Sequence, residues 1–501
     1  MPDLLPTALF GLTLLVVVGL GEAMRALGVR AEASRRFVHA ATGLAVVFCP
    51  PYFASPAGIY ALAAVFVAVN VIAVRRKLFL GMHGIQRETW GTVAFPVALL
   101  VALGVCWTAD PSRVYVLRTA FLVLALSDPL AAFVGGRVGW GAFRVNGQTK
   151  TAAGTAAFVV SAAGLAGLGL WAWGPEAFGT AEIASGALVV AGLAGTAEAL
   201  ATKGWDNLWV VIAVIVALVA LDRQPEAAGV LVLALAVAVG FAWAAWRVGF
   251  LDLSGALAAG VLAWGVLGLG PLAVGGWGWA AAGLTFFFTS SVLSKLGRRR
   301  KRDAEARAAK GSRRDAGQVA ANGGVAGVLL ALTVFVPARW QGVLFLGYLG
   351  AFAAAAADTW GTEVGTWVGG ATRDVLRWRP VPPGESGGVS LAGSLGALAG
   401  ALVVATVAVP FLSETVTLGR AVATLAAVGG AGVVGAWADS VLGATVQARF
   451  VLPDGTRTER PETDGTPLPL ASGWRPMTND RVNLACTLVG ATVGLALSLG
   501  G

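Results

Sequence analysis

Residues 353–370, AAAAADTWGTEVGTWVGG, place two carboxylates, Asp358 and Glu363, in an apolar stretch rich in alanine and glycine. Hydrophobic residues make up 57% of the chain and charged residues 13%, so a stretch of this kind fits a lipid bilayer. An ionised acid at the centre of a membrane helix costs about 2.5–3.5 kcal/mol on insertion scales, so it usually faces a partner, a metal or water. The stretch therefore predicts a membrane helix that carries functional acids.

The rest of the chain has the same character. Its mean hydropathy is +0.76, and its apolar runs approach the ~20 residues that a spanning helix needs. We predict an all-α, polytopic integral membrane helical bundle with about 14–16 transmembrane helices. The first apolar run, residues 5–20, lacks a basic start and a small-residue cleavage pattern, which predicts a retained helix.

The net charge of +9 is concentrated in loops, with ten basic residues between Lys295 and Arg314. The positive-inside rule predicts that these loops are cytoplasmic, and that they contact anionic lipid. No folded soluble domain accompanies the charge, so we expect a lipid bilayer as partner and no nucleic acid. We expect a multi-pass protein of the cell (inner) membrane with active sites that face the cytoplasm.

The residue types available also restrict the metal. The only histidines are His39 and His83, and the three cysteines lie far apart in apolar segments. A bound metal is therefore expected to be a hard cation held by oxygen atoms, which indicates Mg²⁺ as the cofactor.

The chain reads as two modules. The polar break DRQPE at residues 222–226 ends the first, and a new apolar segment opens after Arg247. We predict a first module over residues 1–225 and a second over residues 245–501.

Four polar motifs follow one another in the first module. They are ASRRFVHAATG (33–43), SDPLAAFVGGRVG (127–139), QTKTAAGTAAF (148–158) and TAEALATKGWDNLWV (196–210). Arg36 and His39 are three residues apart and share a helical face. Glycines such as Gly135 and Gly136 allow backbone amides to approach phosphate, and the predicted helix start after Lys150 favours an anion. The motifs supply oxygen ligands and cations together, as a metal–nucleotide site requires.

In sequence and order, these motifs resemble the membrane kinases that include phytol kinase and dolichol kinase, relatives of the phosphatidate cytidylyltransferase group. The resemblance covers most of residues 30–215 and implies CTP-dependent phosphorylation of an isoprenoid alcohol. This chain has Ser127-Asp128-Pro129 where many relatives have Gly-Asp, and Ala153 where relatives often have an acid.

With that reaction in view, each polar residue of the first module receives a role. Mg²⁺ is assigned to Asp128, Asp206 and Asn207, and the alcohol proton to His39 or Glu198. The nucleotide phosphates are assigned to Arg36, Arg137, Lys150, Gly154 and Thr155.

The second module carries its own series of motifs. They are LDLSGALAAG (251–260), FFFTSSVLSKLG (286–297), GQVAANGG (317–324), ADTWGTEVG (357–365), PPGESGGVSLAGSLG (382–396), ADSVLGATVQ (438–447) and NDRVNL (479–484). This series resembles the membrane protein family that includes plant phytyl-phosphate kinase. The resemblance implies transfer of a second phosphoryl group, from an isoprenyl monophosphate to the diphosphate.

The acids of the second module pose a geometric problem. Asp358 and Glu363 are five residues apart, about 140° around a helix, so a straight helix does not aim both at one Mg²⁺. A helix break at Gly361 would bring them together. We assign metal or catalytic roles to Asp358, Glu363 and Asp439, with Asn479 and Asn483 completing a polar site between helices.

The glycine-rich loop of the second module is the expected phosphate cradle, because its backbone amides precede a new helix at Leu391. Its candidate phosphate-binding residues are Gly384, Ser386, Gly387, Gly388 and Ser390. Elsewhere, Gln318 and Asn322 are four apart and share a helical face. Pro453-Asp454-Gly455 is typical of a hairpin turn.

We therefore predict a bifunctional kinase for isoprenoid salvage, acting on phytol, geranylgeraniol or farnesol with CTP or another nucleoside triphosphate. The isoprenoid alcohol and its monophosphate are its expected partners. Two alternatives stay open: a secondary transporter, since intramembrane acids and glycine-rich interruptions also mark transporters, and a CTP-dependent cytidylyltransferase acting on a lipid phosphate.

Overall fold

A computed structural model describes residues 3–76, 89–296, 313–412, 417–463 and 466–499. His83 and most of the basic segment between Lys295 and Arg314 lie outside the described residues. The chain forms two compact units, residues 1–235 and 236–501.

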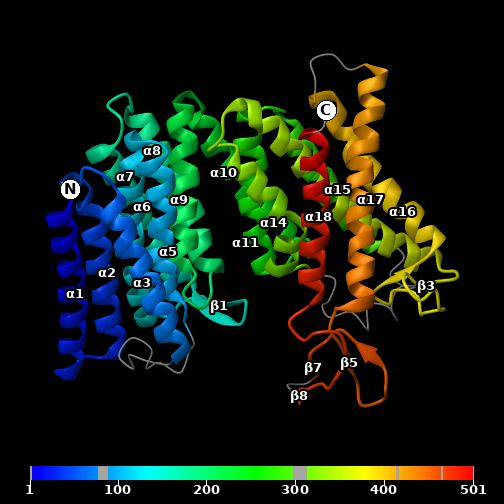
Figure 1. Ribbon diagram of the computed structural model, residues 1–501, viewed down its shortest axis with the longest axis horizontal. Coiled ribbons are helices and arrows are strands. Elements are labelled where there is room, and N and C mark those ends of the chain that lie inside the picture. Colours follow the sequence, from blue (N-terminus) through cyan, green and yellow to red (C-terminus); the bar gives the residue numbers. More distant parts are fainter. Residues whose placement is uncertain (1–2, 77–88, 297–312, 413–416, 464–465, 500–501) are drawn as a thin grey trace. The chain divides into compact units, whose positions relative to one another are not determined.

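Unit 1 is a helical bundle with one β-hairpin (Figure 1). Its helices are α1 (Leu4–Ala26), α2 (Ala31–Phe48), α3 (Ala57–Arg76), α5 (Gly91–Leu103), α6 (Val114–Val138), α7 (Ala152–Trp173), α8 (Thr180–Leu200), α9 (Asp206–Arg223) and the first part of α10 (Ala228–Arg247). Strands β1 (Ala142–Val145) and β2 (Gln148–Thr151) pair antiparallel between α6 and α7.

The β-hairpin follows from local sequence. Asn146 and Gly147 both have positive φ, 48° and 76°, which is the backbone that a two-residue hairpin turn requires. The strand ends at Thr151, whose side chain accepts a hydrogen bond from Gly154 N at 3.2 Å and so caps α7. The predicted helix start after Lys150 is confirmed, and the hairpin places Lys150 immediately before it.

Unit 2 is also helical (Figure 1). Its helices are α11 (Leu253–Trp264), α12 (Gly278–Lys295), α14 (Ala316–Leu332), α15 (Ala338–Val368), α16 (Leu391–Ala408), α17 (Leu418–Thr445) and α18 (Asn479–Leu499). Its short strands are β3 (Arg373–Asp374), β4 (Gly388–Val389), β5 (Arg449–Val451), β6 (Arg457–Thr458), β7 (Glu462–Thr463), β8 (Thr466–Pro467) and β9 (Leu470–Ser472). The turn at Gly455, with φ 82°, joins β5 to β6, which confirms the predicted hairpin.

The long helix α15 is the centre of unit 2, and it contacts α14, α16, α17 and α18. The run of alanines at residues 353–357 is buried in these contacts. Small residues let membrane helices approach closely, and this is the main source of packing energy where lipid surrounds the protein. The motif that opened the sequence therefore stabilises the bundle as well as carrying the acids.

The described residues contain twelve helices that are long and apolar enough to cross a membrane, so the protein is an integral multi-pass membrane protein. The helices α2, α9, α12 and α14 are not among the twelve. The predicted total of about 14–16 spans is reached only if helices of this second group also span.

Two local predictions are wrong. No break occurs at Gly361, because α15 is continuous from Ala338 to Val368, and Gly361 instead packs against α16: a Cβ there would lie 3.2 Å from Gly393 O. Gly135 and Gly136 do not form a turn, since α6 continues to Val138 and ends at Gly139. Gly135 lets α7 approach, as a Cβ there would lie 2.6 Å from Thr151 Oγ1.

The contact between α15 and α18 gives a stability prediction. A Cβ at Gly350 would lie 2.2 Å from Gly490 O, so Gly350→Val is expected to force these helices apart. We expect a loss of about 1–3 kcal/mol, the usual cost of overpacking, measured as a lower thermal unfolding midpoint in detergent. Gly342→Val on the same helix is the control, because a Cβ at Gly342 meets nothing within 4 Å. Equal midpoints for the two variants would contradict the packing described.

Candidate functional site

Unit 1 contains a cavity of about 550 Å³ that is polar at one end and apolar along the rest. On α1 the lining runs from Phe10 and Leu14 to Glu22, about 18 Å along a helix. On α2 it runs in the opposite sense, from Arg36 and His39 to Val46. Because a short connection joins the end of α1 to the start of α2, the polar residues of both helices lie at the same end of the cavity.

The helices α3 and α5 repeat this gradient. Ile59 and Phe66 of α3 line the apolar part, and Leu99 of α5 does the same, whereas Thr92 lies near the start of α5. The cavity thus has the shape and polarity of an amphiphile with one polar head and a long apolar tail.

The polar end collects the residues that the sequence singled out in separate motifs. Arg36, His39, Asp128, Asp206 and Asn207 all line the cavity. The charges of Asp206, His39 and Arg35 act on Asp128, so these groups are near one another. The sequence could not supply this proximity, because the residues lie on three helices, α2, α6 and α9.

The histidine is held in a defined orientation. His39 Nε2 lies 3.2 Å from Leu124 O and 3.8 Å from Asp128 Oδ2. A carbonyl oxygen only accepts hydrogen bonds, so Nε2 donates to Leu124 and carries the hydrogen. In the neutral ring Nδ1 is then the nitrogen that accepts a proton.

The donor set of the polar end fits Mg²⁺ held together with a phosphate ligand. Within the described residues no three His, Cys, Asp or Glu side chains gather closely enough to hold a metal by themselves. Mg²⁺ does not need such a cage, since it is commonly bound through one or two carboxylates plus waters and substrate phosphates. Asp128 and Asp206 are the carboxylates that would hold it. Thr92 Oγ1, which has no hydrogen-bond partner among the described residues, adds a hydroxyl.

Other predicted residues of unit 1 lie away from the cavity lining. Lys150 Nζ donates to Glu198 O at 2.8 Å and pairs with the Glu198 carboxylate. Arg137 is exposed and lies over the Phe133 ring, 4.5 Å from its centre. Gly154 packs against α6, where a Cβ would lie 2.9 Å from Ala131 O. Thr155 Oγ1 is buried, and no described residue hydrogen-bonds it.

The ion pair of Lys150 gives a second stability prediction. Glu198 is 6% exposed, so Lys150→Met would leave a buried carboxylate without its cation, at a cost of about 3 kcal/mol. Lys150→Met/Glu198→Gln is expected to recover most of this loss in thermal unfolding experiments. The control is Arg144→Met, an exposed position on the same hairpin. A double variant as unstable as the single one would contradict the structural role of the pair.

In unit 2 the acids meet in a polar network at α15, α17 and α18. The side chains of Asp358 and Asp439 hydrogen-bond one another. With its amide nitrogen turned toward Asp439, Asn483 donates to Oδ1 at 3.3 Å and to Asn479 O at 3.2 Å. Two carboxyls in contact either share a proton or hold a cation between them, so this pair is the oxygen donor set of unit 2 that fits Mg²⁺.

The network continues to the glycine-rich loop. Gln447 Nε2 donates to Asn479 Oδ1 at 3.4 Å and to Glu459 Oε1 at 2.9 Å. Ser386 Oγ donates to the same Glu459 carboxylate. A continuous set of polar side chains therefore joins the buried acids to the loop that was predicted to hold phosphate.

Within that loop the predicted residues have different tasks. Gly384 and Gly387 both have φ 80°, a backbone that glycine adopts without strain. At Gly387 the loop also lies against α17, since a Cβ would be 2.6 Å from Ala444 Cβ. Gly388 pairs with Asp374 in the strand pair β3–β4, and Ser390 Oγ caps α16 by accepting from Gly393 N at 3.1 Å.

Arg314 is the cation nearest these acids in electrostatic terms. Burial lowers the pKa of its guanidinium, and the negative charges of Glu363 and Asp358 oppose that shift. Glu363 therefore contributes through Arg314, whereas Asp358 also pairs with Asp439. An arginine remains charged under all ordinary conditions.

Sequence reasoning missed several residues of these sites. Lys203 lines the unit 1 cavity with φ 55°, a left-handed backbone that is uncommon for lysine and often marks functional turns. The Lys-Gly pair at residues 203–204 was the available signal. Glu459 lies in the polar segment after α17, but no local pattern distinguishes it from its charged neighbours.

Fold and sites together define a polytopic helical membrane protein with buried polar clusters between its helices. The chain belongs to the family described as integral membrane protein DUF92, whose sequence model matches residues 236–491. Protein PGR of Arabidopsis thaliana is 31% identical over 261 residues, which are 48% of this chain and 86% of that protein. The uncharacterized membrane protein sll0875 of Synechocystis sp. is 28% identical over 227 residues, 44% of this chain and 76% of that protein. No solved structure gives a significant match.

Proposed function

We propose that the protein is a bifunctional membrane kinase that converts an isoprenoid alcohol to its monophosphate in unit 1 and then to its diphosphate in unit 2. The observation that carries this proposal is the cavity of unit 1. Its apolar length suits a prenyl tail, and its polar end brings together Asp128, Asp206, His39 and Arg36. The motif resemblances of both halves support the same reaction.

In the first step, the oxygen of the alcohol attacks the γ-phosphorus of CTP, the bond from that phosphorus to the bridging oxygen breaks, and CDP leaves. Phosphoryl transfer depends chiefly on positioning and charge neutralisation. Arg36 and Lys203 are the cations of the cavity that face the nucleotide phosphates. When bound, Mg²⁺ neutralises phosphate oxygens.

His39 is the favoured acceptor of the alcohol proton. It lines the cavity beside Asp128, and its Nδ1 is the basic nitrogen when Nε2 donates to Leu124 O. The alternative base, Glu198, pairs with Lys150 and is not part of the cavity lining.

In the second step the acceptor is a phosphate monoester, which is already an anion and needs no general base. This agrees with a second module in which the sequence has no histidine at all. The Asp358–Asp439 pair, linked through its network to Ser386, is the proposed centre.

The test uses purified full-length protein in detergent with Mg²⁺, γ-labelled CTP or ATP and a panel of prenyl alcohols. We expect label in prenyl monophosphate first and in prenyl diphosphate later, with release of a nucleoside diphosphate. Release of pyrophosphate with a CDP-linked product would favour a cytidylyltransferase. Absence of any labelled lipid would contradict the kinase.

A further inference from the structure

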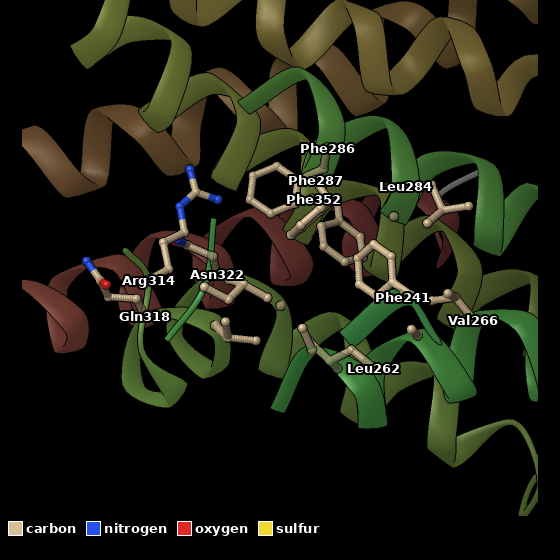
Figure 2. A pocket seen from close by; sticks show the side chains of 16 residues that line it. Phe241, Leu262, Val266, Leu284, Phe286, Phe287, Arg314, Gln318, Asn322 and Phe352 are labelled. Carbon is tan, nitrogen blue, oxygen red and sulfur yellow. The ribbon is translucent and has the colours of Figure 1, made fainter. Parts of the chain in front are cut away.

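A second, smaller cavity lies in unit 2, and its lining is polar at one end only. It measures about 70 Å³. Figure 2 shows Arg314, Gln318 and Asn322 on one side of it and the rings of Phe241, Phe286, Phe287 and Phe352 on the other. The cavity therefore combines one cation and two amide groups with an aromatic wall.

The cation at this cavity lacks a direct partner. Among the described residues, no side-chain hydrogen bond or ion pair is made by the Arg314 guanidinium, and the nearest charges that act on it are Glu363 and Asp358. A guanidinium withdrawn from water is costly unless an anion pairs with it. Arginine is also the side chain best suited to a phosphate, because its planar fork donates two parallel hydrogen bonds.

The backbone of Arg314 is fixed, although its side chain is unpaired. Arg314 N donates to Phe250 O at 3.1 Å, and Arg314 O accepts from Asp252 N at 3.1 Å. Asp315 then caps α14 in a box with Gln318, whose backbone N donates to Asp315 Oδ1 at 2.9 Å. The guanidinium is thus presented from a rigid base, which lowers the entropic cost of binding a ligand.

The size of the cavity limits what its aromatic part can hold. One water needs about 10–15 Å³ by this measure, so 70 Å³ accommodates roughly five water-sized groups. One branched isoprene unit has about that number of heavy atoms. The rings of Phe286 and Phe352, whose centres are 5.3 Å apart, form an apolar surface for it.

We propose that this cavity is the acceptor site of unit 2, in which Arg314 binds the phosphate of an isoprenyl monophosphate and the phenylalanine rings hold its first isoprene unit. The proposal rests on the proposed function for the identity of the ligand. Gln318 and Asn322 supply amide groups beside the phosphate. Asp358 and Glu363 act on Arg314 electrostatically, so the acceptor phosphate would lie next to the acids that are assigned to the transfer.

The first test is kinetic and uses the full-length protein with geranylgeranyl monophosphate as acceptor. Arg314→Gln is expected to raise KM for this acceptor about 10- to 100-fold, the size of one lost charge-assisted contact, with a smaller change in kcat. Arg313→Gln, which removes the adjacent exposed charge, is the control and should leave KM within about twofold. A KM for Arg314→Gln equal to that of the control would overturn the proposal.

A second variant addresses the aromatic part and does not depend on the folding of Arg314→Gln. Val266→Phe is expected to fill the cavity and raise KM for the same acceptor, while Arg314 keeps its charge. Unchanged KM in this correctly folded variant would show that the isoprene unit binds elsewhere.

Equilibrium binding without nucleotide separates this proposal from the proposed function. Labelled geranylgeranyl monophosphate should bind the wild type in a manner that depends on Arg314, and phosphatidate and inorganic phosphate should compete weakly. Arg314-dependent binding without any transfer would uphold the site and contradict the kinase. Transfer that is unaffected by Arg314→Gln would do the opposite, and equal competition by phosphatidate would overturn the isoprenoid assignment.

Discussion

Replacing Asp128 by asparagine is expected to reduce the conversion of a prenyl alcohol to its monophosphate by about 100- to 1,000-fold, the usual range for the loss of one electrostatic group at a transition state. Asp128 lines the polar end of the unit 1 cavity, 3.8 Å from His39 and under the charge of Asp206. Asparagine keeps the size of the side chain and removes its negative charge. The measurement is the initial rate of labelled monophosphate formation from γ-labelled CTP.

The same variant should leave the conversion of added prenyl monophosphate to the diphosphate unchanged, because that step is assigned to unit 2. Asp110→Asn is the matched control, since Asp110 binds the backbone and hydroxyl of Ser112 and is not part of the cavity lining. Parallel loss of both products in a folded Asp128→Asn protein would contradict the division of labour between the two units.

The second large effect is expected at the carboxyl pair of unit 2. Asp358→Asn and Asp439→Asn should each reduce diphosphate formation by about 100- to 1,000-fold and leave monophosphate formation from the alcohol intact. Asparagine can still hydrogen-bond the remaining carboxyl, so the contact between α15 and α17 is retained. The rate with added prenyl monophosphate is the quantity to measure.

Because the two acids touch, their effects should not add. The double variant is expected to be about as impaired as either single variant, since residues in direct contact lose one shared interaction. Asp454→Asn, in the exposed turn between β5 and β6, is the control. Full additivity in the double variant would show that Asp358 and Asp439 act at separate places.

The class of the fold could be predicted from sequence because hydrophobicity is a property of composition and run length. The helical membrane bundle is confirmed on that basis, and the Pro453-Asp454-Gly455 hairpin is confirmed because turn chemistry is local. The break at Gly361 was expected from the needs of a metal site, but close packing against α16 explains that glycine. Glycine serves both purposes, and only the neighbouring helix distinguishes them.

The candidate sites could be predicted less completely. Motifs identified Arg36, His39, Asp128 and Asp206, and the structure brings them to one cavity. The same reasoning set Lys150 with the phosphate ligands, whereas it pairs with Glu198, because the sequence alone does not show which acid lies within reach of a lysine. Arg314 was hidden for the opposite reason, as one of ten basic residues whose charge alone indicates membrane topology.

The central claim, that the unit 1 cavity holds an isoprenoid with its hydroxyl at the polar end, is tested most directly by photo-crosslinking. A geranylgeraniol analogue with a photoreactive group at the tail end would be bound to the full-length protein, and its adducts mapped by mass spectrometry. The account predicts adducts at the apolar end of the cavity, at Phe10, Leu14 or Ile59, that unlabelled geranylgeraniol suppresses. Adducts confined to the exposed surface of α1, at Leu5, Leu12 or Val16, and insensitive to competitor would contradict it.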